Sequence, residues 1–211
     1  MYCPAHFQED RPAVLAGLIE QFALATVVGT GPSGLVADHI PLVYQAEPSS
    51  AGKLIGHVAK NNPLWQLYSD QELLVVFQGP SSYISPNWYA TKAEAGKVVP
   101  TWNYAVVHVY CTLTAIHDHQ QILQIITDLT DRYEASQSHP WQVSDAPQAF
   151  TERLVGNIVG IELKIKRMHG KWKVSQNQPP QNQQSVALGL LEKGGDASVQ
   201  MAHMIETYAS K

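Results

Sequence analysis

Stretches of apolar residues along this chain follow two different spacings. Runs rich in Val, Ile, Leu and Thr between short turns predict strands, and apolar residues repeating every three or four positions predict helices. The predicted strands are 24–29, 35–44, 53–58, 72–79, 104–116, 157–167 and 171–175. The predicted helices begin near Asp10, Asn62, Gln120, Asp145 and Asp196. In the helix that begins at Asp145 and Pro147, Phe150 and Leu154 are expected to face inward.

The order of these elements predicts an antiparallel fold. The turn GTGPSG, Gly29 to Gly34, joins the first two strands in a hairpin, and His169-Gly170 is expected to turn the last one. Helices lie at the start, middle and end of the chain and not after every strand, which argues against a parallel sheet. We therefore expect a mainly β (α+β) fold, an antiparallel barrel with peripheral helices. The polar segment 176–185, QNQPPQNQQS, is expected to be a linker or surface arm.

One segment carries more aromatic rings than a connecting loop needs. Between the apolar ends of the stretch 73–110, the sequence is dense in Trp, Tyr, Ser, Thr and Asn. Flat, partly polar rings of this kind suit a surface that holds a flat ligand or a partner chain. The rings belong to Tyr83, Trp88, Tyr89, Trp102 and Tyr104.

Composition limits the class of protein. The 211 residues carry a formal net charge of −4, which is not the electrostatic footprint of a nucleic-acid-binding protein or of an anionic-membrane binder. Two cysteines cannot build a multi-disulfide framework, and the N-terminus shows no apolar signal segment, so we expect a cytoplasmic protein. No apolar run approaches the roughly 20 residues of a membrane helix.

The familiar catalytic and metal motifs are missing. GTGPSG lacks the ending of a phosphate loop and leads into a strand, so it is interpreted as a hairpin turn. His39, His57 and His108 fall on three predicted strands, but no HExxH supports a metal site, and none is predicted. No nucleophile motif of the GxSxG type is present, and no catalytic residue is identified.

Two segments are candidates for anion binding. Lys164 to Lys173 holds five Lys or Arg and no acid, and alternation places Lys171 and Lys173 on one face. This run is interpreted as a solvated hairpin face, with an anion site or a DNA contact as alternatives. His57, Lys60 and Asn61 stand at a strand end before a helix start, where donors can bind a phosphate or simply form a polar turn.

Several long motifs resemble the PaiB-like family, whose members are described as FMN-binding negative transcriptional regulators. The motifs include GHVAKNNPLW, VVFQGPSSYISPNWYATK, GKVVPTWNYAVVHVY and IVGIELKIKRMHGKWKVSQN, and the resemblance covers Met1 to about Asn177. It implies an FMN-binding split β-barrel related to pyridoxamine-phosphate oxidase, usually a homodimer with the flavin in a cleft at the subunit interface. We expect this domain over 1–177, with a linker and terminal helix over 178–211.

The resemblance also implies a set of flavin contacts. The phosphate would be held by His57, Lys60 and Asn61, with Ser82 or Tyr83 beyond the next strand. His39 would lie on a strand beneath the ring. The isoalloxazine would lie near Trp88, Trp102, Asn103 and Lys173.

Two other functions remain open on the same scaffold. One is a flavin reductase or other oxidoreductase, in which the flavin carries the hydride chemistry. The other is a haem-binding barrel that uses His39, His57 or His108 as an axial ligand. DNA contact is open too, although the sequence shows no helix-turn-helix and the net charge is negative.

Overall fold

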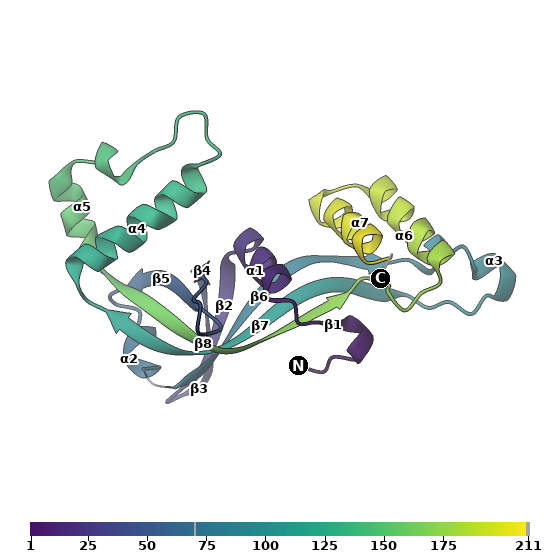
Figure 1. Ribbon diagram of the computed structural model, residues 1–211, viewed down its shortest axis with the longest axis horizontal. Coiled ribbons are helices and arrows are strands. Elements are labelled where there is room, and N and C mark those ends of the chain that lie inside the picture. Colours follow the sequence, from purple (N-terminus) through teal and green to yellow (C-terminus); the bar gives the residue numbers. More distant parts are fainter. Residues whose placement is uncertain (70, 210–211) are drawn as a thin grey trace. The chain divides into compact units, whose positions relative to one another are not determined.

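The computed structural model describes residues 1–69 and 71–209, without the side chain of Ala95. The strands are Gln8–Glu9 (β1), Leu24–Gly31 (β2), Gly34–Pro41 (β3), Val43–Gln45 (β4), Lys53–Ala59 (β5), Glu72–Ile84 (β6), Thr101–Ile116 (β7) and Ile158–Lys173 (β8). The α-helices are Pro12–Gln21 (α1), Leu64–Leu67 (α2), Lys92–Ala95 (α3), His119–Glu134 (α4), Gln148–Val155 (α5), Pro180–Lys193 (α6) and Asp196–Ala209 (α7) (Figure 1). Short 3₁₀ helices cover Ala5–Phe7 (η1), Pro86–Trp88 (η2) and Val143–Asp145 (η3).

The chain divides into two compact units. Unit 1 comprises Met1–Leu18, Gln78–Val107 and the chain from His169 onward, and unit 2 comprises Ile19–Phe77 and His108–Met168. The long strands β6, β7 and β8 contribute residues to both units. The expected division at residue 177 stays a prediction, and residues 210–211 of its second part lie outside the described residues.

The strand order shows why the sheet of unit 2 curls into a barrel. The order is β3-β2-β6-β7-β8-β5-β4, so β3 and β4 lie at opposite ends of the path. Only Leu42 separates these two strands in the sequence, and it is fully buried, with its N–H donating to the Ala23 carbonyl at 2.9 Å. A sheet whose end strands are joined by one residue has to close on itself. The expected antiparallel split barrel with peripheral helices is confirmed.

Residues 35–44 were expected to form one strand, and this is wrong. The segment pairs first with β2, from Leu24↔Pro41 to Gly31↔Gly34, and after Leu42 it pairs with β5. Gly56 allows this crossing, because a Cβ there would stand 2.7 Å from the Pro41 carbonyl oxygen. No turn signal in the sequence marks the change of pairing partner at Leu42, because this change falls within an apolar run.

The predicted hairpin at His169-Gly170 is also wrong. Strand β8 continues unbroken from Ile158 to Lys173, and Gly170 pairs with Glu9 of β1. A Cβ at Gly170 would lie 2.4 Å from Leu15 and 2.6 Å from the Glu9 carbonyl oxygen. The glycine therefore permits close packing, a role that a sequence cannot distinguish from that of a turn glycine.

The second half of the polar segment 176–185 is helical and does not form the expected linker. Helix α6 starts at Pro180, and a proline is favourable in the first turn because its missing N–H is not needed there. Asn182 and Gln183 are buried, and their amides bond to protein groups. Helix α6 packs beside α7, the expected terminal helix (Figure 1).

The helix begun at Asp145-Pro147 was expected to turn Phe150 and Leu154 inward. Helix α5 forms there, but these side chains are 45% and 47% exposed, and Val155 is its buried residue. The inward prediction is wrong, because a helix of eight residues can satisfy its apolar contact with a single side chain. Helix α4 buries Ile122, Ile125 and Leu129.

Candidate functional site

A polar cavity of about 500 Å³ lies within unit 1. Its walls come from the start of β7, the end of β8, the start of α6 and the segment 89–99. The described lining holds two ammonium groups, from Lys97 and Lys173, together with amides and hydroxyls, and it includes no carboxylate. In a chain with net charge −4, such a lining creates a local electropositive hollow that favours an anionic or carbonyl-rich ligand.

Lys173 is the most constrained cation of this cavity. Its Nζ donates to the Thr101 hydroxyl and, at 2.9 Å, to the Trp102 carbonyl oxygen. Burial, and then the nearby Lys171 ammonium, lower the pKa of Lys173. In the described part of the chain, no carboxylate stands within salt-bridge distance of either lysine. A ligand oxygen with negative charge would therefore meet an ammonium group whose charge is not neutralised.

Asn103 is fixed deep in the wall of the same cavity. Its side chain is buried, and Nδ2 donates to the Ser175 hydroxyl at 2.9 Å. Ser175 has φ of +65°, the left-handed region that costs a non-glycine residue about 1–2 kcal/mol. The Gln183 amide donates to the Ser175 carbonyl at 3.2 Å and helps to hold this conformation. Strain held by its surroundings is typical of a position with a binding role.

The segment 89–99 is tied to α6 by paired hydrogen bonds. The Asn182 Oδ1 accepts from the Thr91 N–H at 3.1 Å, and its Nδ2 donates to the Thr91 hydroxyl at 3.0 Å. Trp88 packs on Gly189, where a Cβ would stand 2.6 Å from the indole ring. Trp88, expected near a flavin ring, is thus held by α6.

Ser82 also has a protein partner. It is 2% exposed, accepts a hydrogen bond from Lys193 Nζ at 3.1 Å, and lies 3.5 Å from the Ser198 hydroxyl. Ser82 and Tyr83 lie on β6, which runs five residues beyond its expected end at Gly79. Because successive strand residues face opposite sides, Tyr83 points away from the side that buries Ser82.

Tyr83 and Trp102 form an aromatic pair on the neighbouring strands β6 and β7. Their ring centroids are 6.0 Å apart at 72°, an edge-to-face contact. The two side chains remain 41% and 57% exposed. Large rings left exposed side by side are available to a flat ligand or a partner chain.

The predicted phosphate residues lie together in unit 2. His57 sits on β5 opposite Gly160 of β8, and Lys60 and Asn61 follow in the turn. The Lys60 N–H donates to the Asn157 carbonyl at 2.8 Å, and the Lys60 carbonyl accepts from the Trp65 indole at 3.2 Å. These bonds fix the backbone and leave the Lys60 and Asn61 side chains exposed.

His57 carries a buried atom without a partner. Its Nδ1 is inaccessible to solvent and makes no hydrogen bond to the described residues. Burial lowers the pKa of His57, so the imidazole is neutral at pH 7 and can donate from one nitrogen.

His39 lies on β3 and is exposed, with Nδ1 3.2 Å from the Thr26 hydroxyl. Asp38, its neighbour, accepts from Asn62 at 3.0 Å and so ties β3 to the turn after β5.

The basic run Lys164–Lys173 does not form one charged face. Lys166 and Arg167 are within 3.8 Å and 3.0 Å of the Glu72 carboxylate, and the Arg167 guanidinium lies 3.8 Å above the Tyr110 ring. Lys171 is 7% exposed and donates to the Tyr2 carbonyl at 3.1 Å. The interpretation as a solvated hairpin face is wrong, because β8 makes no hairpin there and four of the five cations, Lys173 included, have partners within the fold.

The residues expected to contact the flavin therefore fall into several smaller groups in the structure. Asn103 and Lys173 line one cavity, Tyr83 and Trp102 form one pair, and His57 lies near the end of β5 before the turn that holds Lys60 and Asn61. Sequence reasoning missed most of the other lining residues of the unit 1 cavity, among them four polar ones. Ser175 lies inside the quoted GKWKVSQN motif and Thr101 and Lys97 inside GKVVPTW, whereas Asn182 fell in the expected linker.

Two further properties follow from the described residues. Over 1–69 and 71–209, no three His, Cys, Asp or Glu side chains are grouped to hold a metal ion. No helix in this part of the chain has the length and apolar character needed to cross a membrane.

Comparison with protein families gives one match over most of the chain. Residues 1–167 match the model described as "Putative FMN-binding domain". An uncharacterized protein of Emericella nidulans is 34% identical, over 97% of this chain and 96% of its own length. The Bacillus subtilis protein named "Protease synthase and sporulation protein PAI 2" is 27% identical over 100% of this chain and 99% of its own length.

Solved structures share the fold at low sequence identity. The FAD and heme binding protein from Mycobacterium smegmatis superposes with a TM-score of 0.59 at 15% identity, covering 79% of this chain and 73% of that one. A "putative 5-nitroimidazole antibiotic resistance protein" from Bacteroides thetaiotaomicron gives 0.56 at 11% identity, covering 78% and 85%. At this level of identity, these likenesses bear on the fold alone.

Proposed function

Because the chain belongs to the family described by the "Putative FMN-binding domain" model and is a homologue of the PAI 2 protein, we propose that it binds FMN. The observation that carries the proposal is the cavity of unit 1, whose lining offers two ammonium groups, several amides and no carboxylate. A flavin presents carbonyl oxygens and ring nitrogens at one end and a phosphate at the other. Both ends need donors, which this chain supplies.

Lys173 and Asn103 are proposed to contact the pyrimidine end of the flavin ring. The Lys173 ammonium is held by two oxygens and retains a third N–H, since an ammonium has three donors. Asn103 is fixed by Ser175, so its orientation does not have to be set when a ligand arrives. Preorganised donors of this kind favour electron density at the oxygens they contact. When bound, the flavin supplies hydride and electron transfer.

Within unit 2, His57, Lys60 and Asn61 are proposed to bind a phosphate group. Support comes from the exposed Lys60 and Asn61 side chains, which stand on a turn whose backbone is fixed by hydrogen bonds. Ser82, Trp88 and His39 have weaker support, because Ser82 bonds to Lys193, Trp88 packs on Gly189, and His39 contacts Thr26.

A homodimer is proposed on the exposed rings of unit 1. Tyr83 and Trp102 present apolar surface that a monomer gains nothing by exposing. A flavin ring or the partner subunit, or both, would cover it. A cytoplasmic location is proposed because both cysteines are free.

The role of a regulator is proposed from the homology with PaiB alone, since the basic run offers no DNA-binding face. An oxidoreductase on the same scaffold is the alternative. NAD(P)H oxidation with added FMN distinguishes the two, and a gel shift at two salt concentrations tests for direct DNA contact.

The test of FMN binding is a comparison of FMN, FAD and riboflavin by fluorescence titration of the full chain. FMN is expected to bind at least tenfold more tightly than riboflavin, because only FMN offers a phosphate for a charge-assisted hydrogen bond. Absorbance near 450 nm in the complex would accompany binding. Equal affinity for FMN and riboflavin would overturn the phosphate assignment. A strong Soret band in the purified protein would favour the haem alternative.

A further inference from the structure

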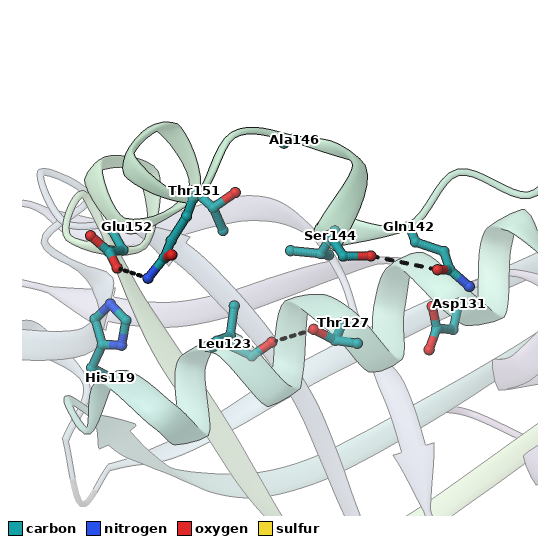
Figure 2. A pocket seen from close by; sticks show the side chains of 11 residues that line it. His119, Leu123, Thr127, Asp131, Gln142, Ser144, Ala146, Thr151 and Glu152 are labelled. Carbon is teal, nitrogen blue, oxygen red and sulfur yellow. Dashed lines mark hydrogen bonds between the residues drawn. The ribbon is translucent and has the colours of Figure 1, made fainter.

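A second cavity, of about 610 Å³, lies within unit 2 and away from the residues described above. It is an open groove between α4 and the segment that contains η3 and the start of α5 (Figure 2). None of the residues proposed for the flavin lines it. Its volume falls in the range of small-molecule sites, about 300–1,000 Å³.

One wall is a single stripe of α4. His119, Leu123, Thr127 and Asp131 all line the groove, and they follow one another at intervals of four residues. Residues at this spacing lie on one face of a helix. The helix rises about 1.5 Å per residue, so the stripe extends about 18 Å from His119 to Asp131. The groove therefore runs along most of the length of α4.

The opposite wall is fixed by its own hydrogen bonds. Gln142 and Asp145 close a capping box around η3, and the Gln142 N–H donates to Asp145 Oδ2 at 2.9 Å. The Trp141 N–H donates to the Glu134 carboxylate at 3.0 Å, which anchors this segment to the end of α4. A wall held in this way keeps the groove open without a ligand.

The charges in the groove all have one sign. Asp131 and Glu152 are lining carboxylates, and the described lining contains no Lys or Arg. Neither carboxylate forms a salt bridge with a described residue; Glu152 only accepts from Gln148 at 2.7 Å. Arg153 lies over the Phe150 ring, 5.4 Å from its centroid, and is not part of the lining.

The two carboxylates stand at opposite ends of the groove. Figure 2 shows Glu152 beside His119 and Asp131 near Gln142, with Leu123 between the two ends. Val143 and Ala146 add apolar surface from the other wall. The Thr127 hydroxyl donates back to the Leu123 carbonyl at 2.8 Å, so it leaves no donor facing the groove.

We propose that this groove binds an elongated aliphatic diammonium compound. Each ammonium group would meet one carboxylate, and the methylene chain between them would lie along the apolar residues. A compound with a single amine could satisfy one end only. An anionic ligand would be repelled from both ends. The proposal is independent of the flavin, because the two sites share no residue.

The test is isothermal titration of the full-length protein at low salt with unbranched α,ω-diamines of increasing length and with n-alkylamines of matched length. Affinity is expected to rise with chain length until one diamine spans both carboxylates, and to exceed that of the matched monoamine. Asp131→Asn and Glu152→Gln should each weaken the best diamine by about three- to fivefold, the effect of an exposed ion pair of up to 1 kcal/mol. The double variant should bind it more than tenfold more weakly.

The matched control is Asp128→Asn. Asp128 lies on the same helix and loses the same charge, but it lines a different cavity of unit 2. This variant should keep the wild-type affinity, and all variants should keep the wild-type far-UV circular dichroism and FMN affinity. An equal loss in Asp128→Asn, a monoamine that binds as well as the best diamine, or no measurable diamine binding would each overturn the proposal.

Discussion

The Lys173 ammonium donates a hydrogen bond to the Trp102 carbonyl oxygen, 2.9 Å away on the neighbouring strand β7. This bond fixes the backbone that carries the exposed Trp102 ring, and it places the ammonium in the wall of the unit 1 cavity. One side chain thus positions an aromatic surface and supplies charge beside it. Substitution of Lys173 should therefore weaken the binding of any ligand that contacts either the Trp102 ring or the Lys173 ammonium group.

Replacing Lys173 with methionine is expected to weaken both FMN and riboflavin binding by about tenfold or more, because a charge-assisted hydrogen bond is worth about 1.5–3 kcal/mol. Methionine keeps the length of the side chain and removes the charge. Fluorescence titration of both ligands measures the effect. Lys164→Met is the control, since Lys164 is an exposed lysine of the same strand outside the cavity. Unchanged affinity for both ligands would show that Lys173 does not contact the flavin.

Replacing Lys60 with alanine should separate the two ligands. If Lys60 holds the phosphate, its loss weakens FMN binding by about 1.5–3 kcal/mol and leaves riboflavin unaffected. The ratio of the two dissociation constants, measured in one titration series, is the readout. A ratio equal to that of the wild type would place the phosphate elsewhere, and parallel losses for both ligands would indicate a folding defect.

Glu9 is expected to stabilise the fold in a pH-dependent way. Burial acts to raise its pKa, but hydrogen bonds from Arg11 and Tyr208 outweigh it and lower the pKa of Glu9 from 4.5 to about 2. A depressed carboxyl pKa stabilises the fold above the unfolded value, and the contribution is lost as pH falls from about 4.5 to about 2. The shift corresponds to about 3 kcal/mol of unfolding free energy at pH 7.

The variants Glu9→Gln and Glu20→Gln test this contribution. Urea unfolding should show a loss of about 3 kcal/mol for Glu9→Gln at pH 7 and a much smaller loss near pH 2.5. Glu20→Gln should change little at either pH, because Glu20 is about half exposed and lies 3.8 Å from Arg132. A loss for Glu9→Gln that is equal at both pH values would exclude the ionised carboxylate as its source.

Local patterns in the sequence predicted the elements better than their connections. Strands β2, β5 and β7 and helices α1, α4 and α7 lie close to their predicted ranges, because each has a clear apolar period. Two of the errors occur at a glycine and a proline. Gly170 resembles a turn glycine but allows Leu15 to approach, and Pro180 resembles a linker proline but starts α6. Only tertiary contacts distinguish these roles.

The residues of the candidate site were likewise predicted where local motifs contained them and missed where tertiary contacts decide their role. The family motifs contained Lys173 and Asn103, which the fold places in one cavity. Ser82 was an expected ligand contact, yet it is buried against Lys193 because β6 continues past Gly79 and α6 covers that side. Asn182, a lining residue, lay in a stretch whose polarity predicted solvent exposure. A buried amide that is fully bonded looks the same in a sequence as an exposed one.

Two glycines in helices should respond in opposite directions to alanine. At Gly189 in α6 a Cβ would stand 2.6 Å from the Trp88 ring, whereas at Gly17 in α1 it would meet nothing within 4 Å. Alanine gains about 1 kcal/mol over glycine in a helix interior, but overpacking costs about 1–3 kcal/mol. Gly17→Ala should therefore stabilise the fold by about 0.5–1 kcal/mol, and Gly189→Ala should destabilise it by about 1 kcal/mol.

Urea unfolding of both variants, followed by circular dichroism, gives the two free energies. The double change Gly189→Ala with Trp88→Leu should recover part of the loss, because the smaller side chain leaves room for the added methyl group. This recovery tests the contact between residues 88 and 189 specifically. The helix propensity of residue 189 does not depend on which residue stands at position 88. If Gly189→Ala is stabilising by itself, α6 does not pack on Trp88 as described, and the cavity wall that Asn182 ties to Thr91 would need a different arrangement.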